Sequence, residues 1–273
     1  MDPADERPIG VFDSGFGGLS VARALIDLLP QEHLVYVGDT GRYPYGPRPA
    51  EEVRGFARQI ASHLVREAQC KLVVVACNTA ASVALTDLSS EHELPVVGVI
   101  EPGMRAARKA TRSGRIGVIG TVGTISSGAY QRLAAETFDG EEVFCAACPG
   151  FVEFVERGET SSDQVHVLAE RLLAPLKEAK VDTLLLGCTH YPFLARTIGD
   201  VMGEDVVLVS SADETAFDVH ELISKGEVGA GTRARHEFYS SGEVDWFVEV
   251  GRRLLGPELT GACQVSFDDD SLA

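Results

Sequence analysis

The stretch "VVVACNTA", residues 73–80, joins a strand pattern to the residue types of a reactive site. Three valines and an alanine run directly into Cys77, Asn78 and Thr79. Such a short, continuous, β-branched run is typical of a parallel strand that is covered on both faces. The polar residues after it are therefore expected at the carboxyl end of a buried strand, where open parallel sheets bind their ligands.

A second stretch, "LLLGCTHY" at 184–191, repeats this order of residue types. An apolar run and a glycine precede Cys188, and Thr189 and His190 follow it. Taken singly, each cysteine can be read as a small buried apolar residue, because free cysteine is most often found in cores. Two thiols at equivalent strand ends, each followed by polar side chains, indicate instead a site that uses both thiols.

Strand and helix patterns alternate along the chain, which predicts an α/β protein with parallel sheets. In 162–179, apolar residues at helical spacing form one stripe, namely Val165, Leu168, Leu172, Leu173 and Leu176. We expect further helices and a strand in 211–256, and a disordered acidic tail over 267–273. The predicted strands cover 9–12, 34–39, 71–76, 95–100, 115–120, 141–146, 182–187 and 205–210.

The sequence also contains an internal repeat. "IGVFDSG" at 9 and "IGVIGTVGT" at 116 start 107 residues apart, and the two cysteines lie 111 residues apart. Two similar α/β units of about a hundred residues explain both spacings. With crossings near "EPG" at 101–103 and "SSADET" at 210–215, residues 1–100 plus 211–273 form the first predicted domain, and residues 101–210 form the second.

The charge balance restricts the kinds of partner. The 273-residue chain carries 24 Lys and Arg against 41 Asp and Glu, a formal net charge of -17. This argues against direct nucleic-acid binding, which needs a basic surface. No run of eighteen apolar residues predicts a membrane span, and the acidic start "MDPADERPIG" lacks the apolar core of a signal peptide. We therefore expect a cytoplasmic protein with no membrane partner.

The six cysteines suit neither a disulfide framework nor a zinc ribbon. Only "CAAC" at 145–148 has the spacing of a metal or redox pair, and no second pair completes a metal site. We expect free thiols and no metal.

Polar groups also follow the first two predicted strands. "FDSGFGG" presents Asp13 and Ser14 before glycines that let the backbone approach a ligand. "GDTGRYPYG" presents Tyr45 and Gly46. Asp13 alone could equally be the N-cap of a helix beginning near residue 16. The glycine-rich turn matches neither the dinucleotide nor the P-loop spacing.

Two thiols on opposite sides of one pocket can invert a carbon centre. One thiolate removes the proton of a bound carbon acid, and the other thiol returns a proton on the opposite face. The pKa of free cysteine, about 8.5, is not far from the working pH of such a base. Covalent catalysis fits less well, because it needs one cysteine with a histidine base rather than two cysteines on opposing units.

These motifs resemble those of the glutamate racemases, within the aspartate/glutamate racemase superfamily. The resemblance implies two α/β domains related by pseudo-twofold symmetry, with the active site in the cleft between them. It also implies an isomerase that uses no cofactor and interconverts L- and D-glutamate for peptidoglycan, and so for cell-wall biogenesis and cell shape. It runs from Ile9 to Leu255 and rests on "GVFDSGFGGLSV", "YVGDTGRYPYGPR", "ACNTAAS", "GVIEPG", "GTVGTISSGAYQ", "CPGFVEFVERG" and "LGCTHYPFL".

The same resemblance assigns roles to individual residues. Cys77 and Cys188 are the two acid/base groups, Asp13 assists Cys77, and Glu156 and His190 assist Cys188. The substrate-binding residues that it implies are Asp13, Ser14, Tyr45, Gly46, Asn78, Thr79, Thr121, Thr189 and His190.

Several alternatives stay open at this point. The chain has "CPGFVEFVERG" where the family often has "CPLLVPLVEEG", so Glu153 adds a carboxylate near Glu156, and either one can be the partner of Cys188. Family members are commonly homodimers, which we expect here, and some are described as gyrase inhibitors. The alternative functions are an aspartate racemase or another superfamily member, a non-catalytic amino-acid-binding protein, and a gyrase-interacting protein.

Overall fold

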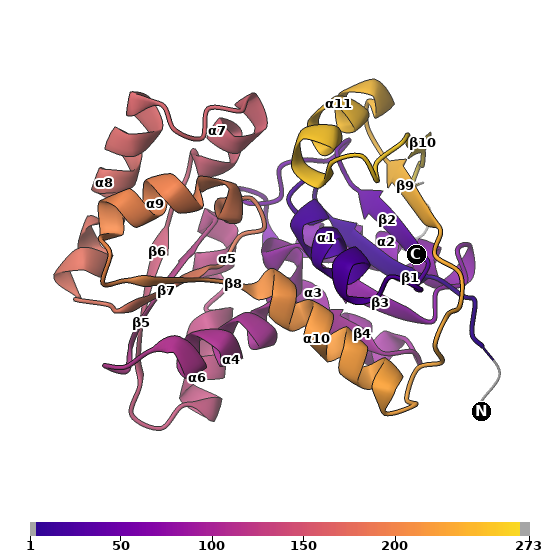
Figure 1. The fold of residues 1–273 in the computed structure, drawn as a ribbon, viewed down its shortest axis with the longest axis horizontal. Helices are drawn as coiled ribbons and strands as arrows, with labels where there is room; N and C mark the ends of the chain where they lie inside the picture. Colours follow the sequence, from indigo (N-terminus) through magenta and orange to yellow (C-terminus); the bar gives the residue numbers. More distant parts are fainter. Residues whose placement is uncertain (1–3, 268–273) are drawn as a thin grey trace.

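Two parallel β-sheets organise the protein (Figure 1), whose computed structural model describes residues 4–267. One sheet has six strands in the order β10-β9-β2-β1-β3-β4, and the other has four in the order β6-β5-β7-β8. Every strand pairing within them is parallel. The predicted α/β class is confirmed, while the predicted disordered tail, apart from Phe267, lies outside the described residues.

The strands and helices have the following bounds. The strands are β1 (Ile9–Asp13), β2 (Leu34–Gly38), β3 (Leu72–Val75), β4 (Val96–Gly98), β5 (Arg115–Gly120), β6 (Glu142–Ala147), β7 (Thr183–Leu186), β8 (Val207–Ser210), β9 (His236–Ser240) and β10 (Cys263–Gln264). The helices are α1 (Leu19–Leu28), α2 (Ala50–Arg66), α3 (Asn78–Glu91), α4 (Ile100–Ala110), α5 (Val122–Ser126), α6 (Ala129–Thr137), α7 (Phe151–Arg157), α8 (Asp163–Glu178), the 3-10 helix η1 (Tyr191–Leu194), α9 (Ala195–Met202), α10 (Ser211–Ser224) and α11 (Val244–Leu255).

All eight predicted strands exist, and the apolar stripe of 162–179 belongs to α8. The expected further strand in 211–256 is β9, which pairs with β2 along its whole length. The two-residue strand β10 was not predicted, because so short a segment carries no periodic pattern.

The first four strands of each unit are arranged in the same order. The order β2-β1-β3-β4 in one sheet matches β6-β5-β7-β8 in the other, so β1 corresponds to β5 and β3 to β7. In this order the chain reverses its direction of winding between β1 and β3, and again between β5 and β7. Ligands of doubly wound sheets bind outside the carboxyl ends of the strands at such a switch point.

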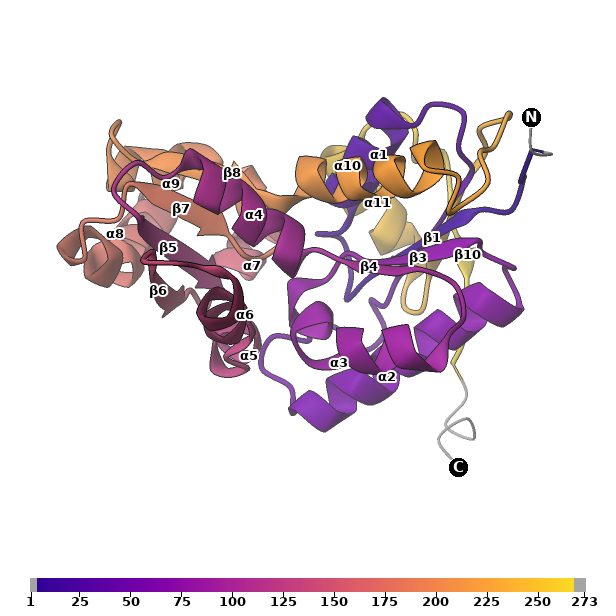
Figure 2. The ribbon, with the colours of Figure 1, turned by 90° about the horizontal axis from the view of Figure 1, so that it is seen from below.

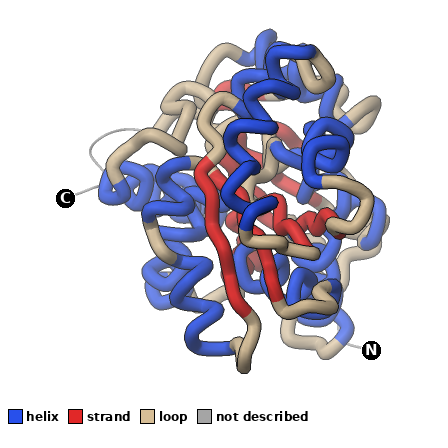
Figure 3. Tube along the Cα trace, turned by 90° about the vertical axis from the view of Figure 1, so that its left-hand side faces the viewer, coloured by secondary structure: helices blue, strands red, loops and turns tan. Residues whose placement is uncertain are grey.

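Helices cover both faces of each sheet. Figure 2 shows α1, α10 and α11 on one face of the six-stranded sheet and α2 and α3 on the other. In Figure 1, α4 and α6 lie on one side of the four-stranded sheet, and α8 and α9 lie on the other. The view along the four-stranded unit shows its strands enclosed between helices (Figure 3).

This double cover explains why the strands are apolar along their whole length. On β5, Ile116 and Val118 join the core shared with the six-stranded unit, whereas Ile119 joins the core beneath α7, α8 and α9. On β7, Leu185 faces the shared core, and its two flanking leucines face the other. Successive side chains of a strand point to opposite faces, so both faces need apolar residues.

The chain crosses between the sheets through α4 and α10, which pack against one another. An ion pair joins Arg105 of α4 to Asp218 of α10. In a second pair between the same helices, the Lys109 Nζ lies 3.8 Å from the Glu214 Oε2. The expected crossings at 101–103 and 210–215 fall in these two helices. None of the helices within residues 4–267 combines the length and apolarity needed to cross a membrane.

Candidate active site

Both cysteines singled out by the sequence lie directly beyond the switch points of their sheets. Cys77 follows β3 and is the N-cap residue of α3, while Cys188 lies between β7 and η1. Both side chains are buried, and both line one cavity of about 120 Å³. The two sheets therefore present their corresponding strand ends, each with one thiol, to a shared cavity.

The Cys77 thiol sits in an environment that favours its protonated form. Burial raises its pKa to about 12, and the negative charge of Asp13 adds to this effect. The nearby N–H groups of Ala80 and Ser14, with the Ser14 hydroxyl, oppose the rise and offset it only in part. The thiolate is thus a strong base once it forms, because basicity rises with pKa.

Asp13 is fully buried at the end of β1, beside Cys77. Its Oδ2 accepts a hydrogen bond from the Gly15 N–H at 3.0 Å, and its Oδ1 accepts one from the Thr189 hydroxyl at 3.4 Å. It is not a helix N-cap, because α1 begins at Leu19 and Gly18 is its N-cap. Asp13 instead joins the end of β1 to the loop that follows β7.

A histidine and a carboxylate stand behind Cys188. The His190 Nδ1 lies 4.0 Å from the Cys188 Sγ, and the His190 Nε2 lies 3.1 Å from Oε1 of Glu156. Burial alone would lower the pKa of His190, but the Cys188 thiol and the Glu156 carboxylate raise it to about 10. The imidazole is therefore protonated at neutral pH and places a positive charge next to the Cys188 sulfur.

The two glutamates of α7 occupy different positions. Glu156 pairs with His190 behind the cavity wall, whereas Glu153 lines the cavity itself. Residues three apart lie on the same side of a helix, so helical spacing alone does not choose between the two glutamates. Of the two, Glu156 holds the place next to His190.

Three threonine hydroxyls meet at the boundary between the two units. Thr79 Oγ1 of α3 lies 3.0 Å from Thr121 Oγ1 and 3.1 Å from Thr124 Oγ1, and the latter two are 3.0 Å apart. Thr121 is also the N-cap of α5, where its hydroxyl accepts the Thr124 N–H. Thr124 was not predicted as a site residue, although it belongs to the motif "GTVGTISSGAYQ". Its position three residues after the helix N-cap Thr121 was the sequence signal that could have identified it.

Asn78 lines the cavity and carries one polar atom without a partner. Its Nδ2 donates to the Tyr130 hydroxyl at 2.9 Å, while its Oδ1 has no hydrogen-bond partner within the described part of the chain. The side chain is almost completely buried. An unpartnered buried acceptor is costly, so this oxygen is suited to a ligand donor such as an ammonium group.

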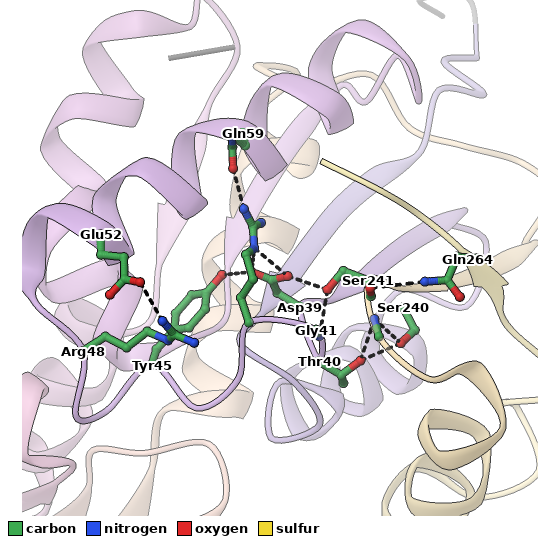
Figure 4. Close-up of polar contacts among 12 residues, drawn as sticks. Asp39, Thr40, Gly41, Tyr45, Arg48, Glu52, Gln59, Ser240, Ser241 and Gln264 are labelled. Carbon is green, nitrogen blue, oxygen red and sulfur yellow. Dashed lines mark hydrogen bonds and ion pairs between the residues drawn. The ribbon is translucent and has the colours of Figure 1, made fainter. Parts of the chain in front are cut away.

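Tyr45 and Gly46 reach the cavity from the loop after β2. The Tyr45 hydroxyl donates to Asp39 (Figure 4). Asp39 does not line the cavity, so this hydroxyl is already engaged by a group outside it. The Gly46 carbonyl accepts the Gly123 N–H at 2.8 Å, which joins this loop to α5. A side chain at Gly46 would collide with Thr121, so the close approach of the two loops requires glycine here.

The cavity gathers most of the predicted site residues. Asp13 and Glu156 lie behind its wall, while Tyr43, Val122 and Cys148 line it without having been predicted as site residues. Within the described range 4–267, no lysine or arginine lines it. The predicted residues that line it are Ser14, Tyr45, Gly46, Cys77, Asn78, Thr79, Thr121, Cys188, Thr189 and His190.

The cysteines are all free thiols, as predicted. Within residues 4–267, no three His, Cys, Asp or Glu side chains gather in an arrangement that could hold a metal ion. The pair Cys145 and Cys148 lies at the end of β6 and in the loop after it, and Cys148 lies at the cavity wall.

Comparison with known proteins gives consistent matches over most of the chain. The family model of the Asp/Glu/Hydantoin racemases matches residues 9–216. The chain is 53% identical over 256 residues to the glutamate racemase of Parafrankia sp., covering 93% of this chain and 92% of that one. A glutamate racemase structure from Bacillus anthracis matches with a TM-score of 0.89 and 41% identity, covering 96% of this chain and 97% of that one. The Francisella tularensis glutamate racemase, solved in complex with D-glutamate, matches with a TM-score of 0.90 and 31% identity, covering 96% and 98%.

Proposed function

This chain belongs to the Asp/Glu/Hydantoin racemase family and racemises glutamate, and from that premise we propose that Cys77 and Cys188 exchange the α-proton. The observation that carries the proposal is that both thiols line one cavity, each from the end of its own sheet. One thiolate takes the α-proton and becomes a thiol. The opposite thiol then protonates the other face of the carbon and becomes a thiolate, so the configuration inverts.

The environments of the two thiols suit this exchange. Burial makes Cys77 a weak acid, and therefore a strong base after it loses its proton. On the other side, protonated His190 lies next to Cys188, with its Nδ1 4.0 Å from the Cys188 sulfur. The site thus holds the proton on Cys77 and a positive charge beside Cys188.

A dicarboxylic amino acid is held in this cavity by neutral donors. Hydroxyl groups of Ser14, Thr79, Thr121 and Thr189 line the cavity. Backbone N–H groups at the start of the 14-residue helix α3 add the favourable end of a helix dipole for a carboxylate. Preorganised donors of this kind stabilise the charge that develops as the α-proton leaves. The unpartnered Oδ1 of Asn78 is suited to the substrate ammonium.

The division into domains is also a proposal. We assign residues 1–100 with 211–273 to one domain and residues 101–210 to the other, since the six-stranded sheet takes its strands from both ends of the chain. Closure of these domains on the substrate would exclude water from the thiols. Hydrogen exchange with and without D-glutamate tests this, because closure should protect the loops after β2 and β5 together.

The location and the assembly of the protein are also proposals. We propose a cytoplasmic homodimer whose product, D-glutamate, is used for peptidoglycan. Native mass spectrometry measures the assembly, and a DNA-supercoiling assay with active-site variants tests a gyrase interaction.

The decisive experiment is incubation of the purified protein with L-glutamate in D2O with no cofactor added. Circular dichroism should decay to zero while NMR shows deuterium entering the α-carbon. Inversion without deuterium incorporation would contradict exchange through the thiols. A parallel incubation with L-aspartate measures the preference between the two substrates; faster turnover of aspartate would contradict the assignment to glutamate.

A further inference from the structure

A buried carboxylate lies outside the cavity and is not used by the mechanism above. Asp39 follows β2, and its side chain is fully buried. It accepts hydrogen bonds from the Arg42 Nε at 2.8 and 3.0 Å, from the Tyr45 hydroxyl and from the Ser241 hydroxyl (Figure 4). A buried carboxylate needs such donors, and their loss is costly.

Of these partners, Tyr45 connects Asp39 to the cavity. The segment 43–47 forms one wall of the cavity, although Asp39 itself does not line it. Burial and the nearby Asp39 charge raise the pKa of Tyr45 far above its ordinary value, so the hydroxyl remains a donor to Asp39 at every working pH. With the hydroxyl held there, Tyr45 and Gly46 line the cavity.

We call Asp39 and the groups that hydrogen-bond to it the Asp39 anchor. Residues from the C-terminal part of the chain also contribute to this anchor. The Thr40 and Ser240 hydroxyls are 2.7 Å apart, and the Gly41 N–H donates to the Ser241 hydroxyl at 3.0 Å. The Gln264 Nε2 of β10 donates to the Ser241 carbonyl at 3.2 Å. Figure 4 shows these contacts side by side, with Asp39 between the helix that carries Gln59 and the turn that carries Ser241.

The guanidinium of Arg42 adds a second link to the end of the chain. It hydrogen-bonds to Asp39 and to Gln59 of α2. It also lies over the ring of Phe56 at 4.2 Å and over that of Phe267 at 4.9 Å. The carboxylate, the arginine and the aromatic rings therefore hold the loop after β2 from three separate segments of the chain.

Building on the proposed function, we propose that Asp39 is a positioning residue that acts through Tyr45 and holds the 43–47 wall in its substrate-binding conformation, with Ser241 as the second fixed point. Preordering of a binding segment lowers the entropy that the ligand must remove. If the anchor is weakened, the substrate itself must order the wall, so the cost appears in KM. The thiols lie on other elements, and kcat changes less.

The test compares Tyr45→Phe and Ser241→Ala with the matched control Tyr239→Phe. Tyr239 lies on β9, and its hydroxyl also donates to a carboxylate, that of Glu237 at 2.8 Å, but it does not line the cavity. Tyr45→Phe and Ser241→Ala should each raise KM for both glutamate enantiomers at least fivefold, with kcat within about threefold of the starting protein. Tyr239→Phe should leave KM unchanged. A lower thermal midpoint with unchanged KM in the first two variants would overturn the proposal, because that is the signature of a purely structural role.

A double-mutant comparison shows whether Asp39 acts through Tyr45. Asp39→Asn combined with Tyr45→Phe should raise KM no more than the larger of the two single changes, because both remove the same link. If the KM increases of the two single variants multiply in the double variant, Asp39 does not act through Tyr45. If the starting protein fails to racemise glutamate, the proposed function fails instead. Hydrogen exchange of residues 40–47 still tests the anchor, since Tyr45→Phe should speed it and Tyr239→Phe should not.

Discussion

The hydroxyl of Thr189 donates to Oδ1 of Asp13 across 3.4 Å, although the two residues are 176 positions apart in the chain. Asp13 ends β1 of the six-stranded sheet, and Thr189 follows Cys188 beyond β7 of the four-stranded sheet. The neighbour of one thiol is thus bonded to the neighbour of the other. This hydrogen bond is a direct contact between the two halves of the site, so we expect a change on one side to affect chemistry on both.

Replacement of either cysteine by serine should slow racemisation strongly, and equally in both directions. The enantiomers have equal free energy in water, so the kcat/KM values of the two directions must stay equal in every variant. We expect kcat/KM to fall by about 10²–10⁴-fold for Cys77→Ser and for Cys188→Ser. NMR in D2O should show residual α-deuteration of one enantiomer only, and of the opposite enantiomer in the other variant. Cys145→Ser should retain activity, and equal loss in that variant would contradict a special role for the pair.

Glu156→Gln should narrow the pH range of activity. The pKa of His190 is raised to about 10 in part by the Glu156 carboxylate, so the imidazolium persists below that pH. Removal of the negative charge lowers this pKa, and His190 loses its proton earlier as the pH rises. The alkaline limb of the kcat/KM profile should therefore move to lower pH by at least one unit.

Glu153→Gln is the matched control for that profile. Glu153 lines the cavity, whereas the hydrogen bond to His190 comes from Glu156. Glu153→Gln should move the alkaline limb of the kcat/KM profile less than Glu156→Gln does. The reverse order of the two shifts would assign the role of histidine partner to Glu153.

Gly17→Ala should damage the site with little effect on folding. A Cβ at Gly17 would lie 2.2 Å from the Thr189 Oγ1 and 2.5 Å from the His190 Nδ1, so both side chains must move. A displacement of about 1 Å in a catalytic group can cost about 100-fold in rate. Gly261→Ala is the control, since a Cβ there meets no atom within 4 Å. Steady-state kinetics and thermal unfolding measure the two effects, and near-normal kcat/KM in Gly17→Ala would show that Thr189 and His190 need not hold these positions.

Asp182→Asn should lower stability near neutral pH and lose this effect in acid. Burial opposes ionisation of Asp182, but hydrogen bonds from the Thr111 hydroxyl, the Ser113 N–H and the Arg112 N–H lower its pKa well below the usual range. A depressed folded pKa adds stability above the unfolded value, and this stability disappears as the pH falls through the folded value. The loss at pH 7 should be about 1 kcal/mol, because Asp182 is only partly buried and solvent screens its interactions. Urea unfolding at several pH values measures it, with exposed Asp200→Asn as the control; a pH-independent difference would contradict the ionic origin.

Much of the fold was predictable because its signals are local. Each predicted strand is a continuous apolar run, which reflects helices on both faces of the sheet, and the stripe of 162–179 follows the period of α8. The equivalence of Cys77 and Cys188 was also predictable from the repeated pattern of residue types around them. The matching places of β3 and β7 in the two strand orders agree with it. By contrast, β10 follows from pairing with β9 rather than from any pattern of its own.

The residues that support the site were less accessible from the pattern. Tyr130 reaches Asn78 from another unit, and Asp39 reaches Ser241 across 202 positions. The local sequence around Tyr130 or Asp39 does not identify the residue that it contacts. Such contacts depend on how separate segments dock, and docking is decided by packing over the whole core.

The sequence by itself determined the α/β class, the strand positions and the two cysteines at strand ends, because hydrophobic period and residue type are local properties of the chain. Only the tertiary structure decided that Glu156 rather than Glu153 meets His190, and that the Tyr45 hydroxyl donates to Asp39. The physical reason is that a helix or loop offers several polar groups at similar spacing. The rotation at which it packs against the rest of the protein selects the one that makes contact.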